Sequence, residues 1–199
     1  AITVEDSGST TLVGTTNALG TVASGNISNT AIVFPAGHII QVVQKTDTDF
    51  GTSDVSAYSN TLFDNLNISI TPHKSSSKIL ITVNLSLSHQ NNDTGHARLV
   101  RDPTGTPVAL AIGAVSGSNV RATFSMRNAS NMTMQHQSMT YLDSPSIPST
   151  PVAIWYGVQG FTSGSQYGEF GYNQPETSTT TDPNFGRHMS ALTLMEVAQ

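Results

Sequence analysis

Six histidines are the residues of this sequence best suited to metal binding, because neutral imidazole is a common metal ligand. They are His38, His73, His89, His96, His136 and His188. No two of them form an H-x-H pattern, and histidines on polar strand faces are usually solvated. A coaxial trimer would need only one such residue from each chain to hold an ion, but the sequence offers no supporting ligands. We therefore predict no metal site from the histidines.

An acidic stretch, 47–51 with Asp54 beyond it, is the second possible metal site. Oxygen ligands at alternate positions are typical of calcium loops. This stretch lacks the full ligand spacing and the closing glutamate. We interpret it as a polar hairpin loop and expect no metal and no cofactor.

Motifs of catalytic nucleophiles and phosphate-binding loops are absent from the sequence. It contains no G-x-S-x-G, no G-x-x-x-x-G-K-[ST], no G-x-G-x-x-G and no H-E-x-x-H. The absence of cysteine excludes disulfides, thiolate zinc ligands and cysteine nucleophiles. The 13 acidic residues show no local spacing that would indicate the carboxylate pair of a glycan-cleaving enzyme. We predict no catalytic residues and a protein that is not an enzyme.

A long stretch rich in Gly, Ser and Thr, residues 162–187, is the main candidate for a binding loop. Its aromatic rings could stack on sugars while its amides hydrogen-bond to sugar hydroxyls. The candidate receptor or interface residues are Tyr167, Phe170, Tyr172, Asn173 and Phe185. The same rings could instead cover an edge of the core or close a subunit interface, and both interpretations stay open.

The charge balance limits the classes of partner. Only 11% of the 199 residues are charged, with 8 basic against 13 acidic side chains and a net charge of -5. Proteins that bind nucleic acids or acidic membranes take much of their affinity from lysine and arginine, so we expect no nucleic-acid partner. No apolar run approaches the roughly 18 residues that span a bilayer, so we expect no membrane insertion. Residues 1–30 lack the regions of a secretory signal.

Alternation of apolar and polar residues shows which elements would position these side chains. Between Ile79 and Ser88 the odd positions are apolar, which is typical of a strand with one buried face. Similar patterns predict strands at 38–46, 62–70, 97–101, 107–112, 120–127, 134–142, 152–158 and 189–197. No stretch has a capped amphipathic helical stripe. We predict an all-β fold with an antiparallel β-sandwich or jelly-roll-like body.

The first residues differ from the rest in composition. Residues 1–30 are rich in Ser, Thr, Gly and Asn, and their apolar residues are scattered. We predict an extended N-terminal arm over 1–35 and the β-sandwich body over 36–199. The arm would attach to another protein by adding a strand to a sheet edge. Its candidate attachment residues are Ile2, Val4, Leu12 and Val13. An extra edge strand of the same domain is the alternative.

Several short segments, taken in order, resemble tail-fibre-like virion proteins of tailed phages, especially phages of marine bacteria and cyanobacteria. These segments are GHIIQVVQ at 37–44, ITP at 70–72, SSSKIL at 75–80, RLVRD at 98–102, YLDSP at 141–145 and LTLMEV at 192–197. The resemblance covers residues 37–198 and leaves out the arm. It is carried by the succession of segments, and not by any one of them.

The resemblance implies a structural protein on the outer surface of a virion, with a β-sandwich body that forms a homotrimer. It supplies no catalytic residues. The expected partners are identical copies through apolar strand faces or loops, other virion proteins through the arm, and a host surface glycan through 162–187. Two other functions stay open: a capsid decoration protein of the same fold, and a carbohydrate-binding module or adhesin.

Overall fold

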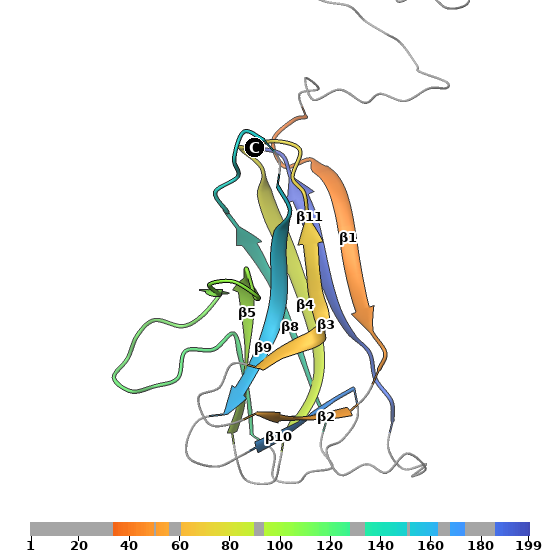
Figure 1. Cartoon of the computed structure of the whole chain (residues 1–199), viewed down its shortest axis with the longest axis vertical. Coiled ribbons are helices and arrows are strands. Elements are labelled where there is room, and N and C mark those ends of the chain that lie inside the picture. Colours follow the sequence, from red (N-terminus) through yellow and green to blue (C-terminus); the bar gives the residue numbers. More distant parts are fainter. Residues whose placement is uncertain are drawn as a thin grey trace, which may run out of the picture. The chain divides into compact units, whose positions relative to one another are not determined.

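The computed structural model describes residues 34–49, 51–55, 61–89, 94–127, 134–150, 152–162, 168–173 and 186–199 (Figure 1). For 51–55, 61–65, 89, 162 and 168–172 it describes the backbone alone. All of these residues belong to one unit, Val33–Gln199. The predicted arm, 1–35, therefore lies almost wholly outside the described residues. The described part contains eleven strands and no helix.

One layer of the fold is a six-stranded antiparallel sheet. Its strands are β1 (Ile39–Asp47), β2 (Gly51–Val55), β4 (Lys78–His89), β8 (Gln135–Asp143), β10 (Gly168–Tyr172) and β11 (Ser190–Val197). The long strand β4 pairs with β8 along one edge, while β11 and then β10 pair with its other edge. Figure 1 shows β1 beside β11, and β2 beside β10.

The other layer is a five-stranded antiparallel sheet. Its strands are β3 (Thr61–Ile70), β5 (Thr94–Arg101), β6 (Val108–Leu110), β7 (Phe124–Arg127) and β9 (Ile154–Thr162). Strand β9 lies between β3 and β5, and β7 and β6 share the free edge of β5. In both sheets, therefore, one central strand changes its partner part of the way along an edge.

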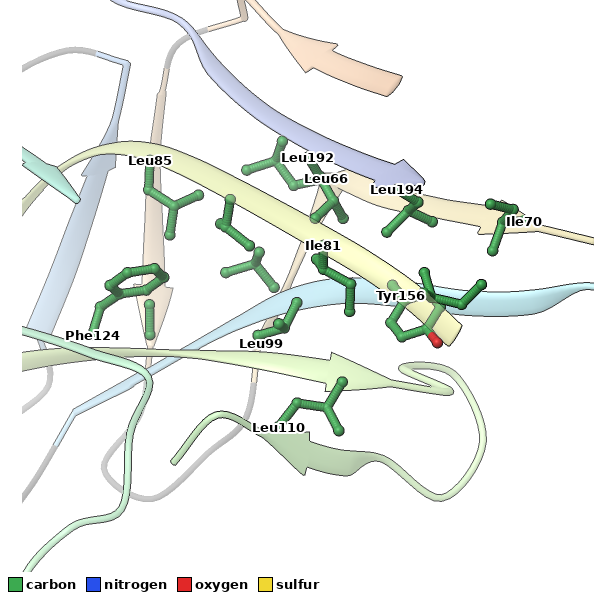
Figure 2. Packing of buried hydrophobic residues seen from close by; sticks show 14 of the residues in the cluster. Leu66, Ile70, Ile81, Leu85, Leu99, Leu110, Phe124, Tyr156, Leu192 and Leu194 are labelled. Atoms are coloured by element: carbon green, nitrogen blue, oxygen red, sulfur yellow. The ribbon is translucent and has the colours of Figure 1, made fainter. Parts of the chain in front are cut away.

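The core lies between the two sheets and is built from alternate residues of each strand. In β4 the inward residues are Ile79, Ile81, Val83, Leu85 and Leu87, each at most 2% exposed. Figure 2 shows two of these, Ile81 and Leu85, packed with labelled side chains of both layers. Burying one apolar face of each sheet removes this surface from water, which is the main driving force for folding. The predicted all-β antiparallel sandwich is confirmed.

Each of the nine predicted strands corresponds to an observed one, but the prediction for 120–127 is too long. The strand β7 begins only at Phe124. Just before it, Thr123 Oγ1 accepts a hydrogen bond from the N–H of Leu99 at 2.9 Å and donates one to the carbonyl of Leu110 at 3.0 Å. The side chain thus fills the gap between β7 and β6, where β5 would otherwise lack a backbone partner.

Two short strands, β2 and β10, were not predicted, so the loop expected at 162–187 is wrong in part. Both have only five residues, GTSDV and GEFGY, and neither carries a run of alternating apolar residues. They form because their backbones pair with each other, with Phe170 opposite Ser53. The hairpin expected at 47–51 is also wrong, since β1 and β2 are not neighbours in the sheet. Just after β1, the N–H of Asp49 donates to Asp47 Oδ1 at 3.0 Å.

Candidate functional site

Several of the candidate residues lie outside the described part of the chain. They are Ile2, Val4, Leu12 and Val13 of the arm, and Tyr167 and Phe185 of the predicted binding loop. Phe170 and Tyr172 belong to β10, whose backbone pairs with β2 on one side and with β4 on the other. Their segment is therefore an internal strand of the sheet and not part of a loop.

Asn173, the last of the candidate loop residues, is fully buried at 0% exposure. Its side-chain amide donates to the carbonyl of Asp47 at 2.9 Å and to that of Asp49 at 2.7 Å. Its Oδ1 accepts a hydrogen bond from Ser190 Oγ at 2.8 Å. The backbone has φ 55°, a left-handed conformation that asparagine tolerates better than most residues. In this arrangement the side chain serves the fold and presents no surface to a receptor.

The contacts of Asn173 lie at the junction where β4 passes from β11 to β10. There the N–H of Ser86 finds no strand partner and donates to Ser190 Oγ at 3.0 Å, while the carbonyl of Ser86 accepts from the N–H of Asn173 at 3.0 Å. Ser86 and Ser190 are both at most 2% exposed. The Ser190 hydroxyl and the backbone N–H of Asn173 thus satisfy the backbone groups of Ser86 that the change of partner leaves over.

We expect Asn173→Ala to lower the free energy of unfolding by about 2 kcal/mol, because the carbonyls of Asp47 and Asp49 and the hydroxyl of Ser190 lose their partner. Urea unfolding monitored by circular dichroism measures this. Asn119→Ala is the matched control, because Asn119 is exposed and lies outside both sheets. Its effect should stay within about 0.5 kcal/mol. Equal losses in the two variants would contradict the role assigned to Asn173.

The outer face of the six-stranded sheet is a candidate interaction surface. Its pairing register places four apolar side chains in one row across four strands. This apolar row consists of Leu142 (β8), Leu80 (β4), Met195 (β11) and Val42 (β1). At its two ends Leu142 is 43% exposed and Val42 is 54% exposed. Single exposed apolar residues are ordinary, but a row of them on one sheet face is typical of an interaction site.

Two rows of small, uncharged side chains lie beside the apolar row. The first consists of Thr140, Thr82, Thr193 and Gln44, and the second of Ser138, Asn84, Ala191 and Thr46. Hydrogen bonds within the rows join Gln44 Nε2 to Thr193 Oγ1 at 2.8 Å and Ser138 Oγ to Asn84 Oδ1 at 2.7 Å. The three rows together are called the uncharged face below, since none of their residues is Asp, Glu, Lys or Arg.

The inner side of the sheet is polar where its outer side carries the apolar row. Asp143 and Glu196 are both opposite Ile79, and Gln41 is opposite Glu196, so all four residues form one inward row. Sequence reasoning missed both carboxylates, because their partners come from distant parts of the chain. Two features of the sequence bear on these carboxylates. Leu80 interrupts the alternation of apolar and polar residues in β4, and Asp143 and Glu196 each directly follow an apolar residue, Leu142 and Met195.

Glu196 is fully buried and its carboxylate is surrounded by donors. Oε1 accepts from the N–H of His73 at 2.7 Å, from Ser77 Oγ at 2.7 Å and from the N–H of Lys74 at 3.3 Å. Oε2 accepts from Gln41 Nε2 at 2.7 Å and from His73 Nδ1 at 2.9 Å. Burial alone would raise the pKa of Glu196, but the hydrogen bonds from His73, Ser77 and Gln41 hold this pKa below its ordinary value. The carboxylate therefore stays charged, and its hydrogen bonds connect the β3–β4 loop, which contains His73, Lys74 and Ser77, to β11.

Asp143 joins the two sheets at the other side of the same row. Its Oδ2 accepts from Arg101 Nη1 of β5 at 2.7 Å and from the hydroxyl of Tyr156 of β9 at 2.8 Å. Burial, and next the charge of Asp143, raise the pKa of Tyr156 far above its ordinary value, so its hydroxyl remains a neutral donor. Burial would lower the pKa of Arg101, but the hydrogen bond and charge of Asp143 raise it overall.

A pocket of about 270 Å³ opens beside Arg101. Its lining residues are Arg101, Asp102, Pro145, Ser146, Val152, Ala153 and Ile154. The two charged residues are of opposite sign and lie 4.0 Å apart, and Arg101 is already bound to Asp143. Because neither a histidine nor a pair of carboxylates lines this pocket, it offers no acid–base pair for catalysis.

Within the described ranges, no group of three or more His, Asp or Glu side chains could together hold a metal ion. The calcium-loop alternative at 47–51 is thus without support from Asp47 and Asp49. In the same part of the chain, no helix is long and apolar enough to cross a membrane. No protein-family model matches the chain, and no curated protein is significantly similar to it.

Proposed function

We propose that this protein is a non-enzymatic virion structural protein of a tailed phage, a tail-fibre-like surface component that assembles as a homo-oligomer. The resemblance of residues 37–198 to such proteins suggests the class. The single observation that supports assembly is the exposed apolar row on the uncharged face. Three copies per assembly is the number that the resemblance implies.

The composition of the uncharged face favours burial against another protein surface. The centre of a protein interface is depleted of charged residues, because a buried charge loses its hydration. Here the polar neighbours of the apolar row already bond to one another, for example Gln44 to Thr193, so covering them leaves few unsatisfied groups. Covering Leu142 and Val42 would remove apolar surface from water, which favours association.

The remaining parts of the proposal concern segments that lie largely outside the described residues. The arm, 1–35, would bind another virion protein by adding a strand to its sheet. The undescribed parts of the predicted binding loop, 163–167 and 174–185, would contact a host surface glycan, and several copies on one particle would raise the avidity of a weak site. Labelling of particles with an antibody to this chain distinguishes a tail fibre from a capsid decoration protein, because the two differ in position.

The mass of the purified chain, measured by light scattering at neutral pH, tests the assembly. We expect about three times 21.0 kDa for the wild type. The double variant Val42→Lys, Leu142→Lys should associate at least about 100-fold more weakly, because each buried ammonium costs several kcal/mol. Val115→Lys is the control, since Val115 is 73% exposed and lies outside the uncharged face.

A wild type that stays monomeric at 100 µM, the highest concentration to be tested, would contradict the proposal. So would a double variant that keeps the wild-type mass. Loss of assembly in Val115→Lys as well would show that any added charge disrupts the oligomer and that the uncharged face is not the interface.

A further inference from the structure

Two histidines that lie 52 positions apart in the sequence meet at one end of the uncharged face. His136 belongs to β8 and is opposite Ser86 of β4, and His188 precedes the first residue of β11 by two positions. Their ring centroids are 4.8 Å apart, with an angle of 63° between the ring planes. His136 is exposed and His188 is half-buried, so a solvent ion can reach the pair.

Hydrogen bonds determine which nitrogen of His136 can bind an ion. Its Nδ1 lies 2.9 Å from Ser86 Oγ, and Ser86 Oγ donates its only hydrogen to the carbonyl of Met189 at 3.3 Å. Ser86 Oγ must therefore accept from the Nδ1–H of His136. In the neutral ring this leaves the lone pair on Nε2. Metal-binding histidines are typically oriented in this way, by a hydrogen bond from the nitrogen that does not touch the metal.

The backbone of His188 is held by the junction of β4, β10 and β11. Its N–H donates to the carbonyl of Asn173 at 2.9 Å, and Ser190, two residues later, is bonded to Ser86 and Asn173. The same buried groups thus hold both residues: Ser86 orients the ring of His136, and the carbonyl of Asn173 anchors the backbone of His188. Prior positioning of two ligands reduces the entropy that an ion must overcome to bind them.

We infer that His136 and His188 of one chain form a two-histidine site for a late first-row divalent transition-metal ion, such as Cu²⁺, Ni²⁺ or Zn²⁺. Bonds of about 2.0–2.1 Å from one ion to two imidazole nitrogens place the ring centres about 5 Å apart, close to the separation observed. Imidazole suits these ions, whereas Mg²⁺ and Ca²⁺ prefer oxygen ligands. Water completes the coordination. This site does not depend on the proposed role in a virion.

Calorimetric titration of the full chain at pH 7.5 with NiCl₂, CuCl₂ and ZnCl₂ tests the site. One ion should bind per chain, with Cu²⁺ tighter than Ni²⁺, and MgCl₂ and CaCl₂ should give no binding. We expect His136→Ala and His188→Ala each to weaken binding at least tenfold. His38→Ala removes an exposed histidine from another part of the fold and is the matched control, with unchanged binding.

Ser86→Ala tests the positioning of His136, because it leaves both ligands in place. It should weaken binding by about tenfold, in the range usual for groups that orient a metal-bound histidine. In the nuclear magnetic resonance spectrum of the wild type, substoichiometric Cu²⁺ should broaden the ring signals of His136 and His188 before those of the other histidines. A thermal melt without metal checks that each variant folds, and His136→Gln replaces His136→Ala if the latter does not.

Three results would overturn the inference. The first is wild-type affinity in a folded His136 or His188 variant. The second is an equal loss of affinity in His38→Ala, which would mean that histidines bind the ion without regard to position. The third is a stoichiometry below one ion per chain, which would mean that separate copies share the ion.

Discussion

Replacing Glu196 by glutamine should lower the free energy of unfolding at pH 7 by about 3 kcal/mol, although the two side chains have nearly the same shape. Both carboxylate oxygens are surrounded by donors, among them the N–H of His73 and the hydroxyl of Ser77. Glutamine turns one oxygen into an NH₂ group, so donors then face donors in a buried place. Urea unfolding of the two proteins at pH 7 measures the difference.

The pH dependence of this difference identifies the carboxylate as its source. Because folding lowers the pKa of Glu196 below its ordinary 4.5, the charged form stabilises the fold above pH 4.5. That stabilisation is lost as the pH falls through the lower pKa of the folded state. The gap between wild type and Glu196→Gln should therefore narrow below pH 4.5. A gap that stays constant down to pH 3 would contradict this account.

Gln44→Ala is the control for Glu196→Gln, since it removes a part-buried hydrogen bond of β1 to β11 from the outer face of the same sheet. It should change the stability by less than about 0.5 kcal/mol at any pH. A comparable loss in both variants would mean that the pairing of β1 with β11 is fragile as a whole, and that the buried carboxylate has no special role.

Replacing Asp143 by alanine should cost about 3–4 kcal/mol, because it leaves a half-buried guanidinium and a buried phenol without their shared acceptor. The two donors come from β5 and β9 of the five-stranded sheet, while Asp143 ends β8 of the six-stranded sheet. The variant therefore loses a polar connection between the layers at that end of the sandwich. Guanidinium chloride unfolding monitored by the single tryptophan measures the loss.

Asp102→Asn is the matched control for Asp143→Ala. The Asp102 carboxylate also approaches Arg101, at 4.0 Å, but its side chain is 53% exposed. Exposed ion pairs contribute about 0–1 kcal/mol, so the effect should be small. Asparagine also tolerates the left-handed backbone at this position, where φ is 54°.

A double-mutant cycle of Asp143→Asn and Tyr156→Phe then separates the hydrogen bond between these two residues from the ion pair with Arg101. Additive effects of the two substitutions would contradict a direct interaction between Asp143 and the Tyr156 hydroxyl.

The two buried carboxylates also bear on the proposed interface. Leu142 precedes Asp143 and Met195 precedes Glu196, so each acid that faces inward sets an apolar neighbour on the outer face. At this end of the sandwich, the hydrogen bonds of Asp143 and Glu196 take the place of apolar packing between the sheets. Since side chains alternate along a strand, the residues that precede these acids lie on the outer face, where Leu142 and Met195 form part of the apolar row.

The sequence by itself determined the strands with a strong alternation and, through them, the all-β class. This information is local: in β4, every second residue from Ile79 to Leu87 is apolar, and one sheet face is enough to bury them. For the same reason β2 and β10 escaped prediction. Their five-residue sequences carry no periodic apolar signal, and they form strands only because they pair across more than a hundred residues.

Only the tertiary structure decided which polar residues work together. Asn173 looked like a binding residue in a glycine-rich loop, yet it is buried, and its side-chain amide bonds to the carbonyls of Asp47 and Asp49, which are distant in sequence. Glu196 meets its donors from 119 to 155 positions away, and His136 meets His188 through a junction that no local pattern indicates. Alternation specifies which face a side chain occupies, whereas strand order and register specify its neighbours, and these depend on pairings distant in sequence.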